Sequence, residues 1–398
     1  MHQTHQRNSV RYYLLLVALL IVFFFVGDFG TLDTQKTAIV MAVGIDRRDD
    51  TFIVTSQIAV PESSKQGKST QTVQLVSRGK TVADAFADIN AKTGWYPKLV
   101  FCNLIVLGEN TAKENVFDAL EFFMLDEYMS DGCLVATCDG LAKDLLNVSA
   151  LIDPSGSIAI QKILSAHAKQ VGTALPVTLR EFSIGYFGES SSGYLPLVTT
   201  KPQQDDLPQA TPTAESGQDS SSSESGTSQD KPVFSAGETA LFVHGKRVGV
   251  WTQEETFAFN AVKNNLRLAS YNVGVGEEYC TLSIKNNSPK NKLVVGKDGR
   301  ASYQIDVTLS AGLLDYSKAP LQNEGADSGD VPHGVFSVAE KRLSSQIERA
   351  FEKCKTTGCD AFGILDLLQK YHPSKTQLLP TLLQRSSAVV SVHFRGVR

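Results

Sequence analysis

The amino-acid sequence predicts a protein of mixed α/β and α+β class, with a body of several subdomains behind one N-terminal membrane helix. Three observations lead to this prediction. An uninterrupted apolar run, Tyr12–Val26, lies near the N-terminus. Strand patterns alternate with helix patterns over residues 37–138, which is typical of a layered α/β structure. A polar segment at residues 201–232 then separates this region from a second one, residues 233–398, with both strand and helix patterns.

The composition limits the class of protein. With 398 residues, the chain is too long for one ordinary hydrophobic core, so about two or three domains are expected. Hydrophobic residues make up 42% and charged residues 20% of the chain, which is typical of a globular protein rather than of a disordered chain or a coiled coil. The net charge of -4 gives no basic face, so nucleic acid is not predicted as a partner.

The apolar run has four interpretations: an uncleaved anchor, a cleaved signal peptide, a lipoprotein signal and a buried core helix. Its fifteen residues are fewer than the about 20 that a membrane-spanning helix needs. This shortfall becomes smaller if the helix extends to Phe29 and the side chain of Arg11 reaches the lipid headgroups. No A-x-A-like cleavage site follows. Because Arg7 and Arg11 precede the run, the positive-inside rule places the N-terminus in the cytoplasm and the body outside. We therefore expect residues 1–36 to hold a basic flank, an uncleaved anchor and a polar joint.

Residues 37–200 are predicted to form an α/β region of one or two subdomains. Its expected strands are residues 37–46, 52–60, 70–77, 99–107 and 132–138. Its expected helices are residues 81–93, a segment from Thr111 onward, and segments near 157–169 and 176–183. The segment 99–107 is almost entirely apolar, as in a strand that is buried on both faces. Thr81 is expected to cap its helix, and Thr111 with Glu114 matches the capping-box pattern.

Residues 201–232 are predicted to be a disordered linker. Leu207 is their only sizeable aliphatic residue, they contain no aromatic residue, and serine and proline are frequent. Such a segment buries too little apolar area to offset the entropy that it would lose on ordering. We therefore place a domain boundary at this segment.

Residues 233–398 are predicted to form a C-terminal α+β domain with a largely antiparallel sheet. A hairpin is expected at residues 240–251, and Thr252 with Glu255 opens the next helix with a capping box. Further strands are expected at residues 279–285, 292–296, 301–309 and 388–394. Ser337 with Glu340 is expected to cap a long helix, and another helix is expected at residues 361–370. The inner stripe of the long helix is predicted to be Leu343, Ile347, Ala350 and Cys354.

The six cysteines are scattered along the chain, which argues against a disulfide framework. Cys133 and Cys138 are an odd number of residues apart, so they face opposite ways if they share one strand. Cys354 and Cys359 are the only plausible local pair, across the end of a helix. Buried free thiols are the preferred interpretation for most of the six.

The sequence contains no motif of an enzyme or a metal site. It lacks paired histidines at metal-ligand spacing, a CxxC pair, an EF-hand, a nucleophile elbow and a P-loop, so no catalytic, cofactor-binding or metal-binding residue is predicted. Asp46 is the most suggestive single acid, although a turn-forming aspartate that bonds to its own loop is the preferred interpretation. Trp95, Tyr96 and Trp251 suit a recognition surface, but packing inside the protein is preferred for all three. An enzyme is therefore not predicted.

Several stretches carry a resemblance when they are taken in order. They are AIVMAVGIDRRDDTFIVTSQIAVP, GKTVADAFADI, YPKLVFCNLIVLGENTAKENVFDALEFFMLD, AGETALFVHGKRVGVWTQEET and CDAFGILDLLQKYHP. Together they resemble the Ger(x)C family of bacterial spore germination proteins. The resemblance covers most of residues 37–398, with the linker as a poorly matched insertion. It depends on the ordered set, since no single motif is specific.

The resemblance implies a function and a location. Members of this family are C subunits of nutrient germinant receptors, which are lipoproteins on the outer face of the inner spore membrane. They work with two integral-membrane subunits, of A and B type. The chain would then be a non-enzymatic receptor component in spore germination, in contact with membrane lipid, with an α/β body of three subdomains. The resemblance implies no germinant-binding residue.

The chain departs from the family pattern at the lipid attachment site. Family members carry a lipobox cysteine, followed by Trp-Asp, about ten residues before the alanine of the first strand. Counting back ten residues from Ala38 leads to Asp28, followed by Phe29. A carboxylate cannot form the thioether to diacylglycerol, so no lipidation is expected and the apolar run would remain as a helical anchor.

Two other classes of function stay open at this point. An anchored extracytoplasmic protein that binds a small ligand outside germination would need an apolar pocket with convergent polar groups. A cell-envelope hydrolase would need a cluster of titratable groups in a cleft, and the sequence points to none.

Overall fold

The computed structural model describes residues 12–20, 37–60, 71–149, 153, 155–201, 232–276, 278–317 and 331–397. Residues 12–20 are helical. Within the described ranges, no helix is long and apolar enough to cross a membrane. The remainder of the apolar run, the joint with Asp28, and residues 202–231 of the expected linker lie outside the described residues.

The first sheet has ten strands and a parallel centre. Its main order is β10-β9-β8-β6-β5-β1-β2-β3, with β4 paired to β1 and β7 to β6. The neighbours within β8-β6-β5-β1 are parallel, whereas the strands on both flanks are antiparallel. The strands are β1 (Thr37–Arg48), β2 (Thr51–Val60), β3 (Gln71–Gly79), β4 (Tyr96–Lys98), β5 (Leu104–Leu107), β6 (Leu134–Cys138), β7 (Val177–Thr178), β8 (Ser192–Lys201), β9 (Val233–Val243) and β10 (Lys246–Trp251).

Helices cover both faces of this sheet. Alternate residues of β5 belong to opposite clusters, Ile105 on one face and Leu104 on the other, as expected for a strand that is buried on both sides. Cys133 and Cys138 also fall into opposite clusters, as predicted. The first face is covered by α2 (Val82–Thr93), α3 (Glu109–Lys113), α4 (Phe117–Leu125) and α8 (Leu179–Phe187). The second face is covered by α5 (Ala142–Asn147), α6 (Gly156–Ile163) and α7 (Ala166–Val171).

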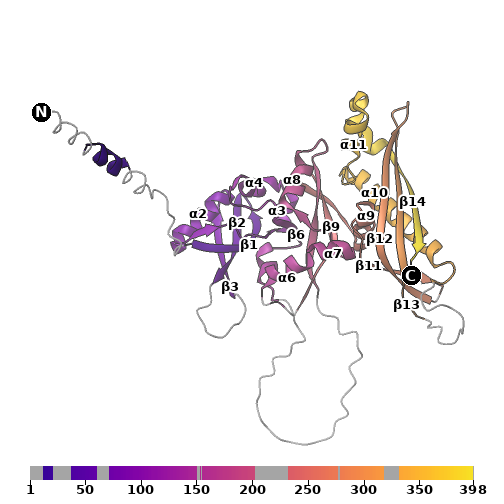
Figure 1. Ribbon diagram of the computed structural model, residues 1–398, viewed down its shortest axis with the longest axis horizontal. Helices are drawn as coiled ribbons and strands as arrows, with labels where there is room; N and C mark the ends of the chain where they lie inside the picture. The colour runs from indigo at the N-terminus through magenta and orange to yellow at the C-terminus, as the bar shows by residue number, and fades with distance from the viewer. Residues whose placement is uncertain are drawn as a thin grey trace, which may run out of the picture.

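The second sheet has four strands in the order β11-β12-β13-β14, and it lies at the opposite end of the body from α2 (Figure 1). All neighbours are antiparallel except β13 and β14. Helices pack on one face, and the predicted inner stripe of the long helix is fully buried there. The elements are α9 (Gln253–Val262), β11 (Ala269–Val275), β12 (Glu278–Val295), β13 (Ala301–Tyr316), α10 (Val335–Thr357), α11 (Ile364–Tyr371), the 3-10 helix η3 (Pro373–Leu378), α12 (Leu379–Arg385) and β14 (Ser386–Gly396).

The hairpin β9–β10 belongs to the first sheet. β9 pairs antiparallel with β8, with Lys201 opposite Val233. We expected residues 233–398 to form a separate C-terminal domain, but their first two strands extend the sheet of the preceding region. Residues 202–232 therefore connect two neighbouring strands of one sheet.

An aromatic cluster joins β10 of the first sheet to the core of the second sheet. The ring of Trp251, in β10, lies 4.7 Å from that of Phe259 and 6.0 Å from that of Phe362. Its indole Nε1 donates a hydrogen bond to the carbonyl oxygen of Ala350, in α10, at 3.1 Å. Polar contacts reinforce this joint, because Nζ of Lys353 lies 2.7 Å from the carboxylate of Glu255.

Local signals at helix starts have mixed outcomes. The cap by Thr81 and the capping box of Thr252 with Glu255 are confirmed. The predicted capping box at Thr111 is wrong, because α3 begins directly after β5 and already contains Thr111, whose hydroxyl donates to the carbonyl of Ile45 at 2.9 Å. Ser337 does not cap α10 either, since that helix begins at Val335.

The expected bounds of four elements are also corrected. The strand predicted at residues 99–107 is shortened to β5, because a turn from Leu99 to Cys102 precedes it. The helix predicted near residues 157–169 is divided into α6 and α7, and Ser165 caps the second. The strands expected at residues 279–285 and 292–296 are parts of one strand, β12.

Candidate partner-binding surface

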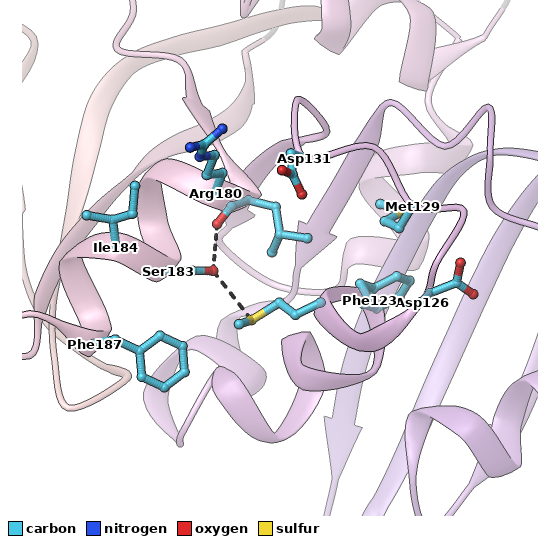
Figure 2. A pocket seen from close by; sticks show the side chains of 10 residues that line it. Phe123, Asp126, Met129, Asp131, Arg180, Ser183, Ile184 and Phe187 are labelled. Carbon is cyan, nitrogen blue, oxygen red and sulfur yellow. Dashed lines mark hydrogen bonds between the residues drawn. The ribbon is translucent and has the colours of Figure 1, made fainter.

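A surface hollow of about 310 Å³ opens between α4, α8 and the loop that follows α4. We call it the α4–α8 hollow. Figure 2 shows Ile184 and Phe187 on one side of it and Phe123 and Met129 on the other. Its lining residues are Phe123, Met124, Asp126, Met129, Asp131, Leu179, Arg180, Ser183, Ile184 and Phe187.

The start of α8 is fixed by hydrogen bonds at its N-terminus. Thr178 and Glu181 form a reciprocal capping box, in which the hydroxyl of Thr178 accepts from the N–H of Glu181 at 3.2 Å. The first N–H of the helix, that of Leu179, donates to the carbonyl of Cys133 at 2.8 Å. These bonds satisfy donors that a helix start otherwise leaves unpaired. They also hold α8 against the segment that leads into β6.

The inner faces of α4 and α8 pack against each other. Phe123 is buried at the floor of the hollow, and the rings of Phe117 and Phe182 stack with centroids 5.5 Å apart. The hydroxyl of Ser183 donates to the carbonyl of Leu179 at 2.7 Å and lies 3.4 Å from the sulfur of Met124 (Figure 2). Packing and hydrogen bonding therefore hold the two helices in place.

Two large apolar side chains line the hollow and remain largely in solvent. Ile184 is 64% and Phe187 is 69% exposed. Groups of exposed apolar side chains on a soluble surface mark interaction sites, whereas single ones are ordinary. Met124 and Met129 in the lining are flexible side chains that adapt to the shape of a partner.

Charged side chains complete the rim of the hollow. Asp126 and Asp131 lie on the loop after α4, and Arg180 lies in the first turn of α8. An apolar centre with charged groups around it is the common arrangement of a protein–protein interface. The geometry therefore suits the binding of an apolar protein segment.

Asp46 lies elsewhere and has a structural role. The predicted contact with its own loop is wrong, because its carboxylate accepts from the N–H groups of Ala142 and Lys143, at 2.7 and 3.0 Å. These two residues begin α5, so Asp46 connects the end of β1 to a distant helix. Burial raises the pKa of Asp46, and the two backbone hydrogen bonds oppose that rise.

Asp360 plays the same part at α11. Its carboxylate accepts from the N–H groups of Ile364 and Leu365 at 2.9 and 2.8 Å, and its own N–H donates to the hydroxyl of Ser192 at 3.0 Å. Burial raises the pKa of Asp360 to about 6, against the opposing effect of the backbone hydrogen bonds. Neither buried aspartate lines the α4–α8 hollow.

The remaining candidates from the sequence fall outside the hollow. Trp251 is completely buried, so the prediction that it packs inside the protein is confirmed. Trp95 and Tyr96 are exposed, so the same prediction is wrong for these two residues. Cys354 and Cys359 are free thiols, and all six cysteines are buried. Within the part of the chain that the structure describes, no three acidic, histidine or cysteine side chains come together as metal ligands.

Sequence reasoning missed the α4–α8 hollow. The helix expected near residues 176–183 ends before Ile184 and Phe187, whereas α8 continues to Phe187. One signal was present: α4 carries the apolar Met124, which lines the hollow, outside its fully buried stripe. An apolar residue outside the buried stripe of a helix is the pattern that marks such a surface.

Comparison with known proteins identifies the family. Residues 31–200 match the description "Spore germination protein N-terminal domain", and residues 237–381 match "Spore germination B3/GerAC like, C-terminal". The chain belongs to the Ger(x)C family of spore germination proteins. Family membership makes it a C subunit of a germinant receptor, as the resemblance implied. Both α4 and α8 lie in the N-terminal match.

Two Ger(x)C proteins illustrate the likeness. The chain is 21% identical over 382 residues to spore germination protein KC of Bacillus subtilis (strain 168), a match that covers 91% of this chain and 88% of that protein. It also matches the crystal structure of the GerBC protein, with a TM-score of 0.54 and 16% sequence identity, over 89% of this chain and 97% of that one. The second match shows that the fold is shared.

Proposed function

We propose that this Ger(x)C protein is a non-enzymatic subunit of a spore nutrient-germinant receptor that acts through protein–protein contacts. Its contact surface for an integral-membrane subunit, of A or B type, is the α4–α8 hollow. The observation that carries the proposal is the pair of exposed large apolar side chains, Ile184 and Phe187, that line the hollow on a helix whose start is fixed by a capping box. Membership of the Ger(x)C family supports the presence of such a partner subunit.

The partner segment that suits the hollow is apolar and compact, such as one face of a helix. A groove between two helices receives an amphipathic helix through a few apolar anchors. Here Ile184 and Phe187 are spaced three residues apart on one face of α8, so both contact the same partner segment. Arg180 and Asp131 at the rim then restrict which polar groups of the partner lie beside it.

The proposed location is the outer face of the inner spore membrane. The apolar run acts as a retained anchor, supported by the basic flank before it and by the absence of a small-residue cleavage site. Asp28 in place of the lipobox cysteine leaves this run as the attachment to the bilayer. A retained helix attaches a protein more firmly than a single acyl chain does.

A small-ligand-binding protein is the less favoured function. Ligand pockets enclose most of the ligand and present convergent polar groups. In the α4–α8 hollow, the Ser183 hydroxyl is already bonded to the carbonyl of Leu179, and Ile184 and Phe187 present large exposed apolar side chains. This arrangement fits a protein surface better than a small polar nutrient.

The test is an affinity pull-down from detergent-solubilised spore membranes, with a C-terminal tag on this chain and mass spectrometry of the recovered proteins. We expect multi-pass receptor subunits with the unaltered chain and at least a tenfold loss with Phe187→Asp or Ile184→Asp. The matched control is Leu314→Asp, an exposed leucine in β13 of the second sheet. Recovery that both α8 variants leave unchanged would overturn the hollow as the contact surface, and recovery of no receptor subunit would overturn the function.

A further inference from the structure

A second exposed surface lies at the start of the folded body. Trp95, Tyr96, Val100, Phe101 and Tyr128 are between 46% and 61% exposed. We call these five residues the aromatic patch. Four of them come from one short segment after α2. The fifth joins them through Lys98, whose Nζ lies 5.0 Å from the ring centroid of Tyr128.

The backbone of the segment holds these side chains outward. The strand β4 pairs with β1, with Tyr96 opposite Thr37. The turn that follows buries Leu99 and Cys102, and the N–H of Cys102 donates to the carbonyl of Leu99 at 2.8 Å. Because both ends of this turn are buried, its two middle residues, Val100 and Phe101, project into solvent.

The patch lies where the chain enters the body. Thr37 is the first residue of β1, and only ten residues, 27–36, separate it from the end of the apolar run. Ten residues span at most about 35 Å when fully extended. Figure 1 shows β1 and α2 at the end of the body away from the second sheet. If the apolar run lies in the bilayer, the aromatic patch is the part of the body that the covalent connection keeps closest to it.

The composition of the patch fits a lipid interface. Tryptophan and tyrosine are enriched at the membrane–water boundary because their rings are apolar and one edge is polar. Phe101 and Val100 add purely apolar surface, and Lys98 is a long cation that reaches headgroups. We propose that the aromatic patch inserts into the interfacial layer of the membrane that holds the anchor. This inference rests on the proposed anchoring.

Charge next to the patch determines which lipids it prefers. Asp126 and Glu127 precede Tyr128 on the same loop and repel anionic headgroups. Insertion of the aromatic rings is therefore the main contribution to membrane binding by the patch, and this binding does not require anionic lipid. The bilayer contact fixes the orientation of the body relative to the membrane, which a flexible tether alone does not do.

The experiment uses tryptophan fluorescence, because the chain has only two tryptophans, Trp95 and Trp251, and Trp251 is buried in the joint between the sheets. The full chain is reconstituted into nanodiscs of phosphatidylcholine, with and without bromine on the acyl chains. Brominated lipid quenches a tryptophan only at close range. We expect quenching in the unaltered chain, none in Trp95→Phe, and at least a twofold reduction in Phe101→Asp. Leu314→Asp, at an exposed position in the second sheet and outside the patch, should leave quenching unchanged.

The outcomes separate the patch from the anchor. Equal fluorescence in both lipids, from chains that co-purify with the nanodiscs, would overturn the patch proposal and leave the anchoring intact. A chain that does not enter the nanodisc fraction would overturn the anchoring and this proposal together. If Trp95 is unquenched by lipid but becomes shielded from acrylamide in the receptor complex, the patch is a protein contact and the lipid proposal fails.

Discussion

At the scale of single residues, the stretch CDAFG has a structural explanation. Asp360 caps α11, and Phe362 packs between the rings of Phe259 and Phe351, at centroid distances of 5.1 and 5.4 Å. Gly363 then adopts φ = 75°, a left-handed conformation that favours glycine. The stretch therefore closes the joint between the two sheets, and its conspicuous residues serve stability rather than chemistry.

Replacing Phe362 by alanine tests this role. The change leaves a cavity inside the aromatic cluster, so we expect a loss of about 3–5 kcal/mol in the free energy of unfolding. Chemical denaturation measures it. The control is Leu314→Ala, at an exposed position in β13, for which a change within about 0.5 kcal/mol is expected. Equal effects of the two variants would contradict the role of Phe362 in the joint.

The buried carboxyl of Asp360 predicts a pH dependence. Its pKa is about 6 in the folded chain, because of burial, and about 4 when unfolded. Between these values the folded state binds more protons than the unfolded state, so this group's contribution to stability falls as the pH rises from about 4 to about 6. Relative to Asp360→Asn, the unaltered chain should lose about 2 kcal/mol of stability between pH 4 and pH 7.

Denaturation midpoints of both chains across that range measure the difference. The Asp360→Asn chain does not titrate at this position, and its other groups titrate as in the unaltered chain. The difference in stability between the two chains therefore isolates the pH dependence of Asp360. A difference that stays constant, or that grows in favour of the unaltered chain as the pH rises, would contradict the raised pKa.

At the scale of elements, local chemistry predicted some boundaries and distant partners decided others. Thr81 and Thr252 cap their helices as expected, because a cap depends on residues only three positions away. The role of Asp46 was not predictable, since its partners Ala142 and Lys143 lie almost a hundred residues along the chain. The start of α3 was also missed, because the end of β5 sets it. The α4–α8 hollow depends on two helices from separate segments, so no local pattern showed it.

The capping box of α8 connects an element to the proposed function. Thr178→Ala removes the acceptor for the N–H of Glu181, so we expect a loss of about 1 kcal/mol in the free energy of unfolding. Because α8 carries Ile184 and Phe187, recovery of receptor subunits should fall as well, though less than with Phe187→Asp. Thr381→Ala, at an exposed site in α12, should change stability by less than about 0.5 kcal/mol. A stable Thr178→Ala chain with full recovery would count against the importance of this cap.

At the scale of the whole molecule, the core of the second sheet reaches into the first sheet. Leu241 and Trp251, from the first sheet, belong to the same buried cluster as the second sheet and its helices. The sequence predicted the class of both regions from periodicity. It did not show that β8 pairs with β9 across residues 202–231, because periodicity indicates which face of a strand is buried but not which strand lies beside it.

This organisation predicts how the chain behaves when it is cut. Proteolysis within residues 202–231 leaves the β8–β9 ladder and the shared core untouched, so the two fragments should remain together on size-exclusion chromatography. They should separate only in denaturant. Fragments that separate in native buffer would instead indicate two independent domains with a boundary at the linker.

The most direct test of the proposed function is photo-cross-linking from the α4–α8 hollow. A photoreactive amino acid replaces Phe187 in sporulating cells that produce the full chain, and adducts are identified by mass spectrometry after irradiation. We predict a covalent adduct with a multi-pass germinant-receptor subunit from position 187, and none from the same amino acid at position 314 in the second sheet. No receptor adduct from position 187, or equal adducts from both positions, would contradict the account.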